Sequence, residues 1–354
     1  TAFFSASLEL EQNANLIHQI MNDFGPTRIH YLLNSLPNKM FRQIQKSQSN
    51  FKILCLETTC DETAAAVIDQ DLNVLGSVVA TQEELHQKFS GVVPEIAARA
   101  HVERIIPVID QTLKQANLSI SDLDAIAVAN TPGLSGSLLV GVVAAKSLAL
   151  AADIPLIATN HLHAHVYACQ LESETPIFPC VGMIVSGGHT HLYLYHDALT
   201  AEYLGGTIDD AAGEAFDKVA SMLGLPYPGG PAISQKATQG DQNSFTFPRS
   251  FIHEPRLDFS FSGLKTAVRY AIAGPGEVDF ASLNIEEKTR CNIAASFQQA
   301  VVDCLVKKAI QATEQTGIKT LCVGGGVAAN SEFRSQLAVA CETQNVQLNI
   351  APLK

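Results

Sequence analysis

The sequence predicts an α/β protein made of two related lobes. At 354 residues the chain is near the upper limit for one hydrophobic core, so two lobes are expected. Apolar, strand-like runs alternate with segments of helical spacing, as they do in α/β proteins. A strand–turn–strand pattern occurs twice, which indicates that the two lobes are related. A hydrophobic content of 47% with 16% charged residues excludes a disordered or collagen-like chain.

The first lobe is predicted to cover residues 51–160. Strands are expected at 51–57, 64–69, 74–80, 123–129 and 155–159, and helices at 94–117 and 137–152. The turn after the first strand carries Asp61 and Glu62. Residues 137–152 form the longest apolar stretch, but Lys146 interrupts it, so we expect a buried helix and no membrane span.

The second lobe is predicted to cover residues 161–350. A strand at 180–186 runs into Gly187 and Gly188, and a second strand returns at 191–196. Later in the chain come a strand at 321–323, a glycine turn at 324–326 and a helix at 327–341. A glycine turn before a helix presents backbone N–H groups and the positive end of the helix dipole to an anion. The alternative is a tight turn in a packed sheet, because glycine adopts a positive φ without strain. No Walker or Rossmann motif occurs at a strand end, so a nucleotide is expected between the lobes.

The charge of the chain limits its partners. Lys and Arg total 23 against 35 Asp and Glu, and the formal net charge of −12 repels phosphate backbones at long range. A nucleic-acid partner therefore needs a local basic patch or a second protein. The densest basic and aromatic cluster consists of Arg249, Arg256, Phe259, Phe261, Lys265, Arg269 and Tyr270. This cluster suits contact with nucleic acid, or it consists of solvated cations beside core phenylalanines.

Cysteine usage and the N-terminal segment predict a cytoplasmic protein. The eight cysteines form no C-x-x-C pair and lie mostly in apolar runs, so we expect them to be reduced and buried. Residues 1–50 contain two short stretches of helical spacing but no signal or transit pattern, which predicts a helical extension of unknown role. Because residue 1 is Thr, we expect the natural start to lie upstream.

His161 and His165 are candidate metal ligands. They lie four positions apart and share one face of a helix, whereas His163 points elsewhere. A zinc protease would carry Glu directly after the first histidine, but this chain carries Leu162 there, which excludes that mechanism. An Asp, a Glu or a ligand oxygen must complete the site. The alternative is a group of surface or capping histidines.

Residues 207–218 carry five charged side chains on a predicted helix. One interpretation is a solvated face with Asp209 or Asp210 capping the helix N-terminus. The other places Asp217 on a pair of ribose hydroxyls, with a second contact from the glycines of the turn at 228–231.

Nine motifs occur in a fixed order along the chain. They are LETTCDET, GVVPEIAARAH, NTPGLSGSLLVG, the His161/His165 pair, VSGGHT, DDAAGEAFDK, YPGGP, DFSFSGLKT and GGGVAAN. Together they make residues 51–350 resemble the TsaD family of tRNA threonylcarbamoyladenosine synthesis. The resemblance implies the two-lobed actin, Hsp70 and sugar-kinase fold, an α/β architecture with a duplicated RNase H-like unit. Residues 351–354 would then begin a return to the first lobe.

The resemblance implies an acyltransferase that modifies tRNA. The threonylcarbamoyl group would pass from threonylcarbamoyl-adenylate to N6 of the adenosine next to the anticodon, in tRNAs reading codons that begin with A, and AMP would leave. His161 and His165 would bind one divalent ion per subunit, Fe²⁺ in preference to Zn²⁺. Asp61 and Glu62 would act as catalytic carboxylates that bind a cation or orient the attacking amine. Substrate contacts are implied at Ile184, Val185, Ser186, Gly187, Gly188, Asp217, Gly230 and Asn330.

The resemblance also implies partners, and two rival functions are considered beside it. The implied partners are tRNA, a paralogous dimerisation subunit and a small ATPase, with no membrane. The family's third metal ligand, an Asp in a Cys-Thr-Asp-Asn stretch, would lie beyond Lys354, so we expect this chain to be truncated and to bind metal weakly. A small-metabolite kinase of the same fold would consume ATP and give the histidines no role. A non-catalytic scaffold would be expected to lack the histidine pair and the glycine hairpin, both of which occur here.

Overall fold

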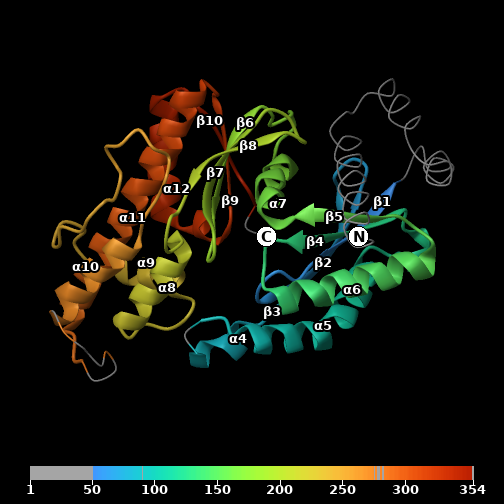
Figure 1. The fold of residues 1–354 in the computed structure, drawn as a ribbon, viewed down its shortest axis with the longest axis horizontal. Coiled ribbons are helices and arrows are strands. Elements are labelled where there is room, and N and C mark those ends of the chain that lie inside the picture. The colour runs from blue at the N-terminus through green and yellow to red at the C-terminus, as the bar shows by residue number, and fades with distance from the viewer. Residues whose placement is uncertain (1–50, 90, 275, 277–279, 281–282, 353–354) are drawn as a thin grey trace, which may run out of the picture. The chain divides into compact units, whose positions relative to one another are not determined.

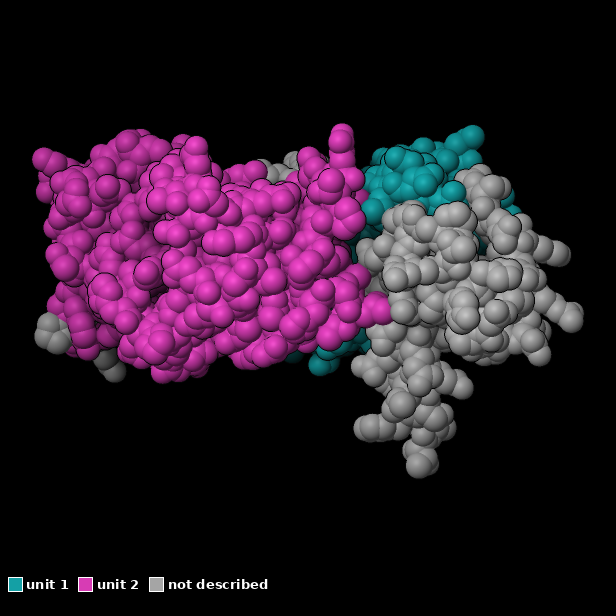
Figure 2. Space-filling view, turned by 90° about the horizontal axis from the view of Figure 1, so that it is seen from above, with its two compact units in different colours: residues 1–164 teal, residues 165–354 magenta. Residues whose placement is uncertain are grey.

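The computed structural model describes residues 51–352 except residues 90, 275, 277–279, 281 and 282. The two short helices expected within residues 1–50 lie outside the described residues. The chain divides into two compact units, Thr1–Ala164 and His165–Lys354 (Figure 2). Each unit contains one five-stranded sheet.

The sheet of unit 1 has the strand order β3-β2-β1-β4-β5 (Figure 1). Its strands are β1 (Lys52–Glu57), β2 (Glu62–Asp69), β3 (Val74–Thr81), β4 (Ala125–Thr131) and β5 (Leu156–Asn160). The first three strands pair antiparallel, and β4 and β5 join parallel to β1. Fully buried side chains such as Leu54, Val67 and Ile126 form the core between this sheet and its helices.

The helices of unit 1 begin with a short one, α4 (Glu83–His86), followed by the turn η1 (Gln87–Phe89). The two long helices, α5 (Pro94–Gln115) and α6 (Ser135–Ala152), pack against each other and against the sheet (Figure 1). The turn η2 (Ile120–Asp122) leads into β4. Among the described residues, α6 alone is long and apolar enough to cross a membrane by length and composition.

The expectation of a buried α6 is only partly right. Small side chains such as Gly141, Ala145 and Ala149 form its buried stripe, which lets the helix approach the sheet closely. Leu139 and Leu150 are exposed on its other side, at 62% and 85%. The apolar composition of α6 therefore has two sources, namely a stripe of small residues in the core and large apolar side chains at the surface of the unit.

The sheet of unit 2 has the order β10-β9-β6-β7-β8, which is the same arrangement of three antiparallel and two parallel strands. Its strands are β6 (Cys180–Val185), β7 (Thr190–Tyr195), β8 (Ala201–Gly206), β9 (Thr320–Gly324) and β10 (Gln347–Ile350). In each unit the first two strands in chain order, β1 and β2 or β6 and β7, form an antiparallel hairpin. The predicted relation between the two halves is therefore confirmed at the level of sheet topology.

The helices of unit 2 are α8 (Ala212–Met222), α9 (Gly229–Ala237), α10 (Ser262–Ala273), α11 (Glu287–Thr316) and α12 (Ser331–Thr343), with the turns η3 (Ala168–Glu172) and η5 (Gly326–Ala329). The core of the unit joins the sheet to α8 and α11 through side chains such as Phe216 and Phe297, whose rings meet edge to face. The short helix α7 (His161–Tyr167) contains the boundary between the two units.

Two local expectations are wrong. The helix expected at 327–341 is divided, because the 3-10 turn η5 ends before Asn330 and α12 begins at Ser331. The cysteines all carry free thiols, but Cys60 is exposed and Cys55 is half-buried. Cys60 lies in a turn whose backbone, rather than its thiol, is held by the core.

Candidate functional site

The carboxylate loop, residues 57–62, contains the turn between β1 and β2 and is held through its backbone. The N–H of Leu134 donates to the carbonyl of Thr59 at 2.8 Å. The carbonyl of Cys60 accepts from Nε2 of His101 at 3.1 Å, and the carbonyl of Asp61 accepts from the N–H of Gln82 at 3.0 Å. Three successive carbonyls are therefore fixed by three different elements. Asp61 and the exposed Glu62 that follows it project from an immobilised backbone.

Glycines let the start of α6 approach this loop. A Cβ on Gly133 would lie 2.7 Å from the carbonyl oxygen of Thr59, which is closer than real Cβ contacts allow. A Cβ on Gly141 would overlap the hydroxyl of Thr58, which itself donates to the carbonyl of Ser137 at 2.9 Å. Close packing against the carboxylate loop thus explains the glycines Gly133 and Gly141 of the motif NTPGLSGSLLVG.

The electrostatics of the loop distinguish its carboxylates. Partial desolvation of the Glu62 carboxylate by the surrounding protein, followed by the negative charges of Asp61, Glu57 and Glu83, raises the pKa of Glu62 above its ordinary value. A carboxylate with a raised pKa is a stronger base than an ordinary one. The raised pKa suits Glu62 to accept a proton.

His161 is oriented by a glutamate that the sequence analysis did not single out. Nδ1 of His161 lies 3.1 Å from Oε2 of Glu57, and Oε1 of Glu57 accepts from the N–H of Thr59 at 2.6 Å. Burial alone would raise the pKa of Glu57, but the hydrogen bond and charge of His161 hold it below the ordinary value. Because Nδ1–H donates to the carboxylate, the neutral form of the ring carries its lone pair on Nε2.

Two of the ligands that a metal site needs lie together in the structure. His161 and His165 lie one turn apart on α7 and are both half-buried. A carboxylate behind one ring is the outer contact that metal-binding histidines commonly have. Within the described residues, no group of three or more His, Cys, Asp and Glu side chains is placed to hold a metal ion.

In unit 2 the predicted phosphate loop is the β6–β7 hairpin loop, residues 186–189. The N–H of Ser186 donates to the carbonyl of His189 at 2.8 Å, and the N–H of His189 donates to Oγ of Ser186 at 3.1 Å. Gly187 and Gly188 are exposed, and a Cβ on either would meet no heavy atom within 4 Å. The space over the glycines can therefore admit a ligand. The side chains of Ile184 and Val185 are fully buried in β6, which leaves only their backbone to a ligand.

Helix α8 begins directly on this hairpin loop. The N–H of Ala212 donates to the hydroxyl of Thr190 at 2.9 Å, and the N–H of Gly213 donates to the carbonyl of Ser186 at 3.2 Å. A Cβ on Gly213 would lie 2.6 Å from that carbonyl oxygen. The hairpin thus satisfies the first N–H groups of α8, and the expectation that Asp209 or Asp210 caps this helix is wrong.

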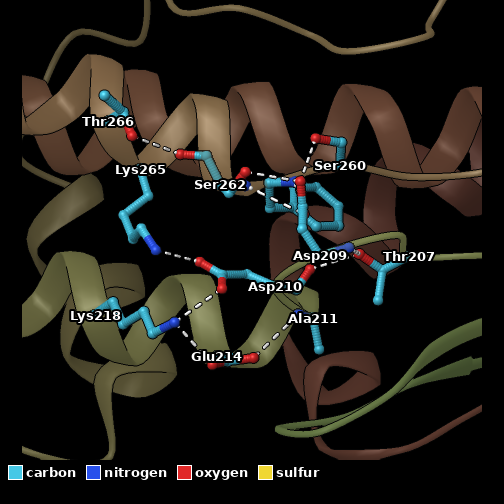
Figure 3. A network of polar contacts seen from close by, with 11 residues as sticks. Thr207, Asp209, Asp210, Ala211, Glu214, Lys218, Ser260, Ser262, Lys265 and Thr266 are labelled. Atoms are coloured by element: carbon cyan, nitrogen blue, oxygen red, sulfur yellow. Dashed lines mark hydrogen bonds and ion pairs between the residues drawn. The ribbon is translucent and has the colours of Figure 1, made fainter.

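The two aspartates instead join α8 to α10 (Figure 3). Asp209 accepts from the hydroxyls of Ser260 and Ser262 at 2.6 and 2.7 Å, and from the N–H of Phe261 at 2.8 Å, at the start of α10. Asp210 accepts from Lys218 of α8 at 2.8 Å and from Lys265 of α10 at 2.7 Å. Burial would raise the pKa of Asp210, but the two lysines hold it below its ordinary value.

The basic and aromatic cluster is largely paired within the protein. Arg249 pairs with Asp303, and Arg256 pairs with Asp258, each at 2.8 Å. Lys265 belongs to the Asp210 contact described above, and both Phe259 and Phe261 are core residues. This arrangement favours the interpretation as cations beside core phenylalanines over a nucleic-acid contact.

The predicted nucleoside contacts have partners inside unit 2. Oδ1 of Asp217 accepts from the N–H of Gly229 at 2.7 Å, and this contact fixes the start of α9, where Gly230 is the second residue. Open space surrounds the Cβ position of Gly230. Asn330 caps α12 by accepting from the N–H of Phe333 at 3.0 Å, and its amide nitrogen donates to Gln298 at 2.8 Å. Neither Asp217 nor Asn330 lies in the hairpin loop, so the structure does not gather all predicted contacts into one set of hydrogen bonds.

Comparison with known proteins identifies one family over most of the chain. The TsaD family model, described as tRNA N6-adenosine threonylcarbamoyltransferase, matches residues 73–354. A protein of that name from Rhodopirellula baltica is 60% identical over 311 residues, which cover 85% of this chain and 87% of the relative. Proteins of the same name from Protochlamydia amoebophila and Geotalea daltonii are 49% and 46% identical, over 83% and 84% of this chain and 85% of each relative.

Solved structures support the fold. The chain is similar to full-length HypF in a phosphate- and nucleotide-bound form, with a TM-score of 0.55, 14% identity, and coverage of 85% of this chain and 52% of that one. It is also similar to HypF from T. kodakarensis, with a TM-score of 0.53, 14% identity, and coverage of 85% and 44%. At such low identity these likenesses show the architecture alone.

Proposed function

The chain belongs to the TsaD family of tRNA N6-adenosine threonylcarbamoyltransferases, and we propose how its residues carry out the reaction of that family. The enzyme is a transferase of tRNA modification that joins a threonylcarbamoyl group to N6 of adenosine. The 60% identity over 311 residues is the observation that carries this conclusion. It favours neither a small-metabolite kinase nor a non-catalytic scaffold.

We infer that the donor is threonylcarbamoyl-adenylate and that the acceptor is the adenosine next to the anticodon in tRNAs reading codons that begin with A. The N6 lone pair attacks the carbamoyl carbon and forms the new C–N bond. The bond from that carbon to the phosphate oxygen breaks, and AMP leaves with the electron pair. N6 loses a proton in this step, and Glu62 accepts it because its pKa is raised. Asp61 orients the attacking amine.

Unit 2 binds the adenylate in this proposal. The exposed glycines of the β6–β7 hairpin loop let backbone N–H groups approach the phosphate, where they stabilise the charge that develops on the leaving AMP. Asp217 and Gly230 contact the nucleoside, and Asn330 supports that site by fixing the start of α12. The contact between α8 and the hairpin loop keeps this loop in one conformation.

His161 and His165 would hold a divalent ion, Fe²⁺ in preference to Zn²⁺. The contact between Glu57 and Nδ1 of His161 supports this role, since metal-binding histidines commonly donate their other ring N–H to a carboxylate. When bound, the ion would act as a Lewis acid on the carbamoyl oxygen. Glu57 itself fixes the orientation and tautomer of the ring.

The partner subunits would contact unit 1. Val102 and Ile106 of α5 and Leu139 and Val143 of α6 are each more than half exposed, on two helices that pack together. Neighbouring exposed apolar side chains mark protein contact sites. We assign this face to the paralogous dimerisation subunit, and a small ATPase joins the same complex. A second protein also supplies the positive charge that a chain of net charge −12 needs to bind tRNA. The free thiols fit a cytoplasmic enzyme.

The histidine pair provides the test of this proposal. The double variant His161→Ala, His165→Ala is expected to have a lower metal affinity than wild type in chelator competition and to lose tRNA modification in a reconstituted system. The matched control is His163→Ala, which removes a histidine from the same helix and is expected to retain both. Undiminished transfer by the double variant would exclude the metal mechanism.

A further inference from the structure

We propose that a buried hydrogen-bond chain, His86–Gln82–His101, is a positioning element for the carboxylate loop of unit 1. The inference rests on the proposed function, in which Asp61 and Glu62 take part in the transfer. The predictions made from sequence gave none of these three residues a role. All three have no exposed surface.

The contacts form a continuous path from the start of α5 to the loop. The backbone N–H of Val93 lies 3.3 Å from Nδ1 of His86, and Nε2 of His86 lies 3.2 Å from Oε1 of Gln82. The amide nitrogen of Gln82 lies 3.3 Å from Nδ1 of His101, and Nε2 of His101 lies 3.1 Å from the carbonyl oxygen of Cys60.

The two ends of the path fix the protons within it. The carbonyl of Cys60 can only accept, so Nε2 of His101 carries a proton and Nδ1 of the neutral ring accepts. The N–H of Val93 can only donate, so Nδ1 of His86 accepts and its Nε2 donates to Gln82. Both rings are therefore neutral Nε2–H tautomers, and every hydrogen bond points toward the loop. The hydroxyl of Thr63 donates to Nδ1 of His101 at 2.8 Å, which reinforces this direction.

The loop needs such support because its side chains repel one another. Glu57, Asp61 and Glu62 all act to raise neighbouring pKa values, which is the signature of crowded negative charge. His101 holds the carbonyl directly before Asp61, while the backbone of Gln82 holds the carbonyl of Asp61 itself. The other donor to Cys60, the Ser137 hydroxyl, lies at 3.5 Å and is a much weaker restraint.

Two substitutions of His101 separate its two nitrogens. His101→Gln keeps a donor at the distance of Nε2, so it retains the bond to the Cys60 carbonyl. His101→Asn keeps a polar atom near the position of Nδ1 but is too short to reach that carbonyl. Both place an amide in the same buried site, so a merely structural role predicts similar enzymes. The positioning role predicts that kcat falls by about tenfold to a hundredfold in His101→Asn, with an unchanged KM for the adenylate, and stays within about threefold of wild type in His101→Gln.

The outcomes distinguish this inference from the proposed function. Asp61→Asn and Glu62→Gln are measured in the same assay, with thermal unfolding of every variant. If these two variants keep the wild-type kcat, the carboxylate mechanism fails, and the positioning role fails with it. If they lose kcat but His101→Asn and His101→Gln have equal kcat, only the positioning role is wrong.

Nitrogen-15 NMR of the histidine rings adds a readout that does not depend on activity. His86 and His101 are expected to be neutral Nε2–H tautomers in the folded wild-type protein at pH 7. An Nδ1–H tautomer or a charged ring at either position would overturn the proposed direction of the chain.

Discussion

Substitution of Gly213 by Ala tests the coupling between α8 and the phosphate hairpin. The new Cβ would lie 2.6 Å from the carbonyl oxygen of Ser186 and 2.7 Å from Cα of Gly187, and both neighbours are backbone atoms. To restore an ordinary contact of 3.4 Å, α8 and the hairpin must separate by about 0.8 Å. This movement breaks the 3.2 Å hydrogen bond between the Gly213 N–H and Ser186. Overpacking of this kind costs about 1–3 kcal/mol and the lost hydrogen bond about 1 kcal/mol, while the better helix propensity of Ala returns up to about 1 kcal/mol.

The net expectation is a loss of about 1–3 kcal/mol in the free energy of unfolding, measured by urea denaturation. Because the hairpin loop moves with α8, the KM for the adenylate should also rise. Gly187→Ala is the matched control: its Cβ meets no atom within 4 Å, so stability should change by less than about 0.5 kcal/mol while adenylate binding still weakens. Wild-type stability together with wild-type KM in Gly213→Ala would refute the close packing on which this reasoning depends.

Three further results are expected. Asp210→Asn removes the anion between Lys218 and Lys265. After allowance for the partial exposure of Lys218, this change should lower the free energy of unfolding by about 1–2 kcal/mol in urea titrations. The control Asp110→Asn, at an exposed ion pair, should change the free energy of unfolding by less than about 0.5 kcal/mol. Hydrogen bonds hold the pKa of Asp209 below its ordinary 3.8 in spite of partial burial. The stability that the ionised side chain contributes is therefore present above that pH and is lost as the pH falls through the lowered pKa. The urea midpoint of Asp209→Asn should depend less on pH between about 5 and 3 than the midpoint of wild type. Glu57→Gln weakens the support of His161 and should lower metal affinity by about tenfold to a hundredfold in chelator competition, and equal affinity would exclude the outer-contact role.

Much of the sheet framework could be predicted because the central strands are apolar runs that end at glycine or polar turns. Cys180–Val185 is buried along its whole length and reads as an unbroken apolar segment. The 30-residue helix α11 was not predicted, because it is buried on several sides and its apolar residues form no single stripe. Its packing between other helices depends on contacts that are distant in sequence.

Candidate site residues can be singled out from sequence where a motif combines unusual residue types in a short segment; the structure places the glycine pair in the β6–β7 hairpin loop and the histidine pair on α7. Glu57 was missed because a glutamate at the end of a strand resembles a solvated terminus, and only the fold brings it to His161. His101 was missed although it lies on the buried face of α5 between Ala97 and Ile105. A histidine at that position on an apolar stripe is the signal that could have indicated a buried hydrogen-bond chain.

The capping prediction for Asp209 and Asp210 failed for a related reason. Their spacing before a helix fits the usual pattern of an N-terminal cap, but the hydroxyl of Thr190, which is distant in sequence, already satisfies the first N–H of α8. The carboxylates are then available to join α8 to α10. Local sequence cannot show which of two nearby helix starts receives a carboxylate.

Direct transfer from the adenylate can be measured in a single turnover. Preformed threonylcarbamoyl-adenylate and unmodified tRNA are mixed with the enzyme in its reconstituted complex, and modified adenosine and AMP are quantified together. We expect one AMP to be released for each modified adenosine, with no ATP required for the transfer step itself. Modification that depends on ATP hydrolysis in the presence of the adenylate, or AMP release without modified tRNA, would contradict it.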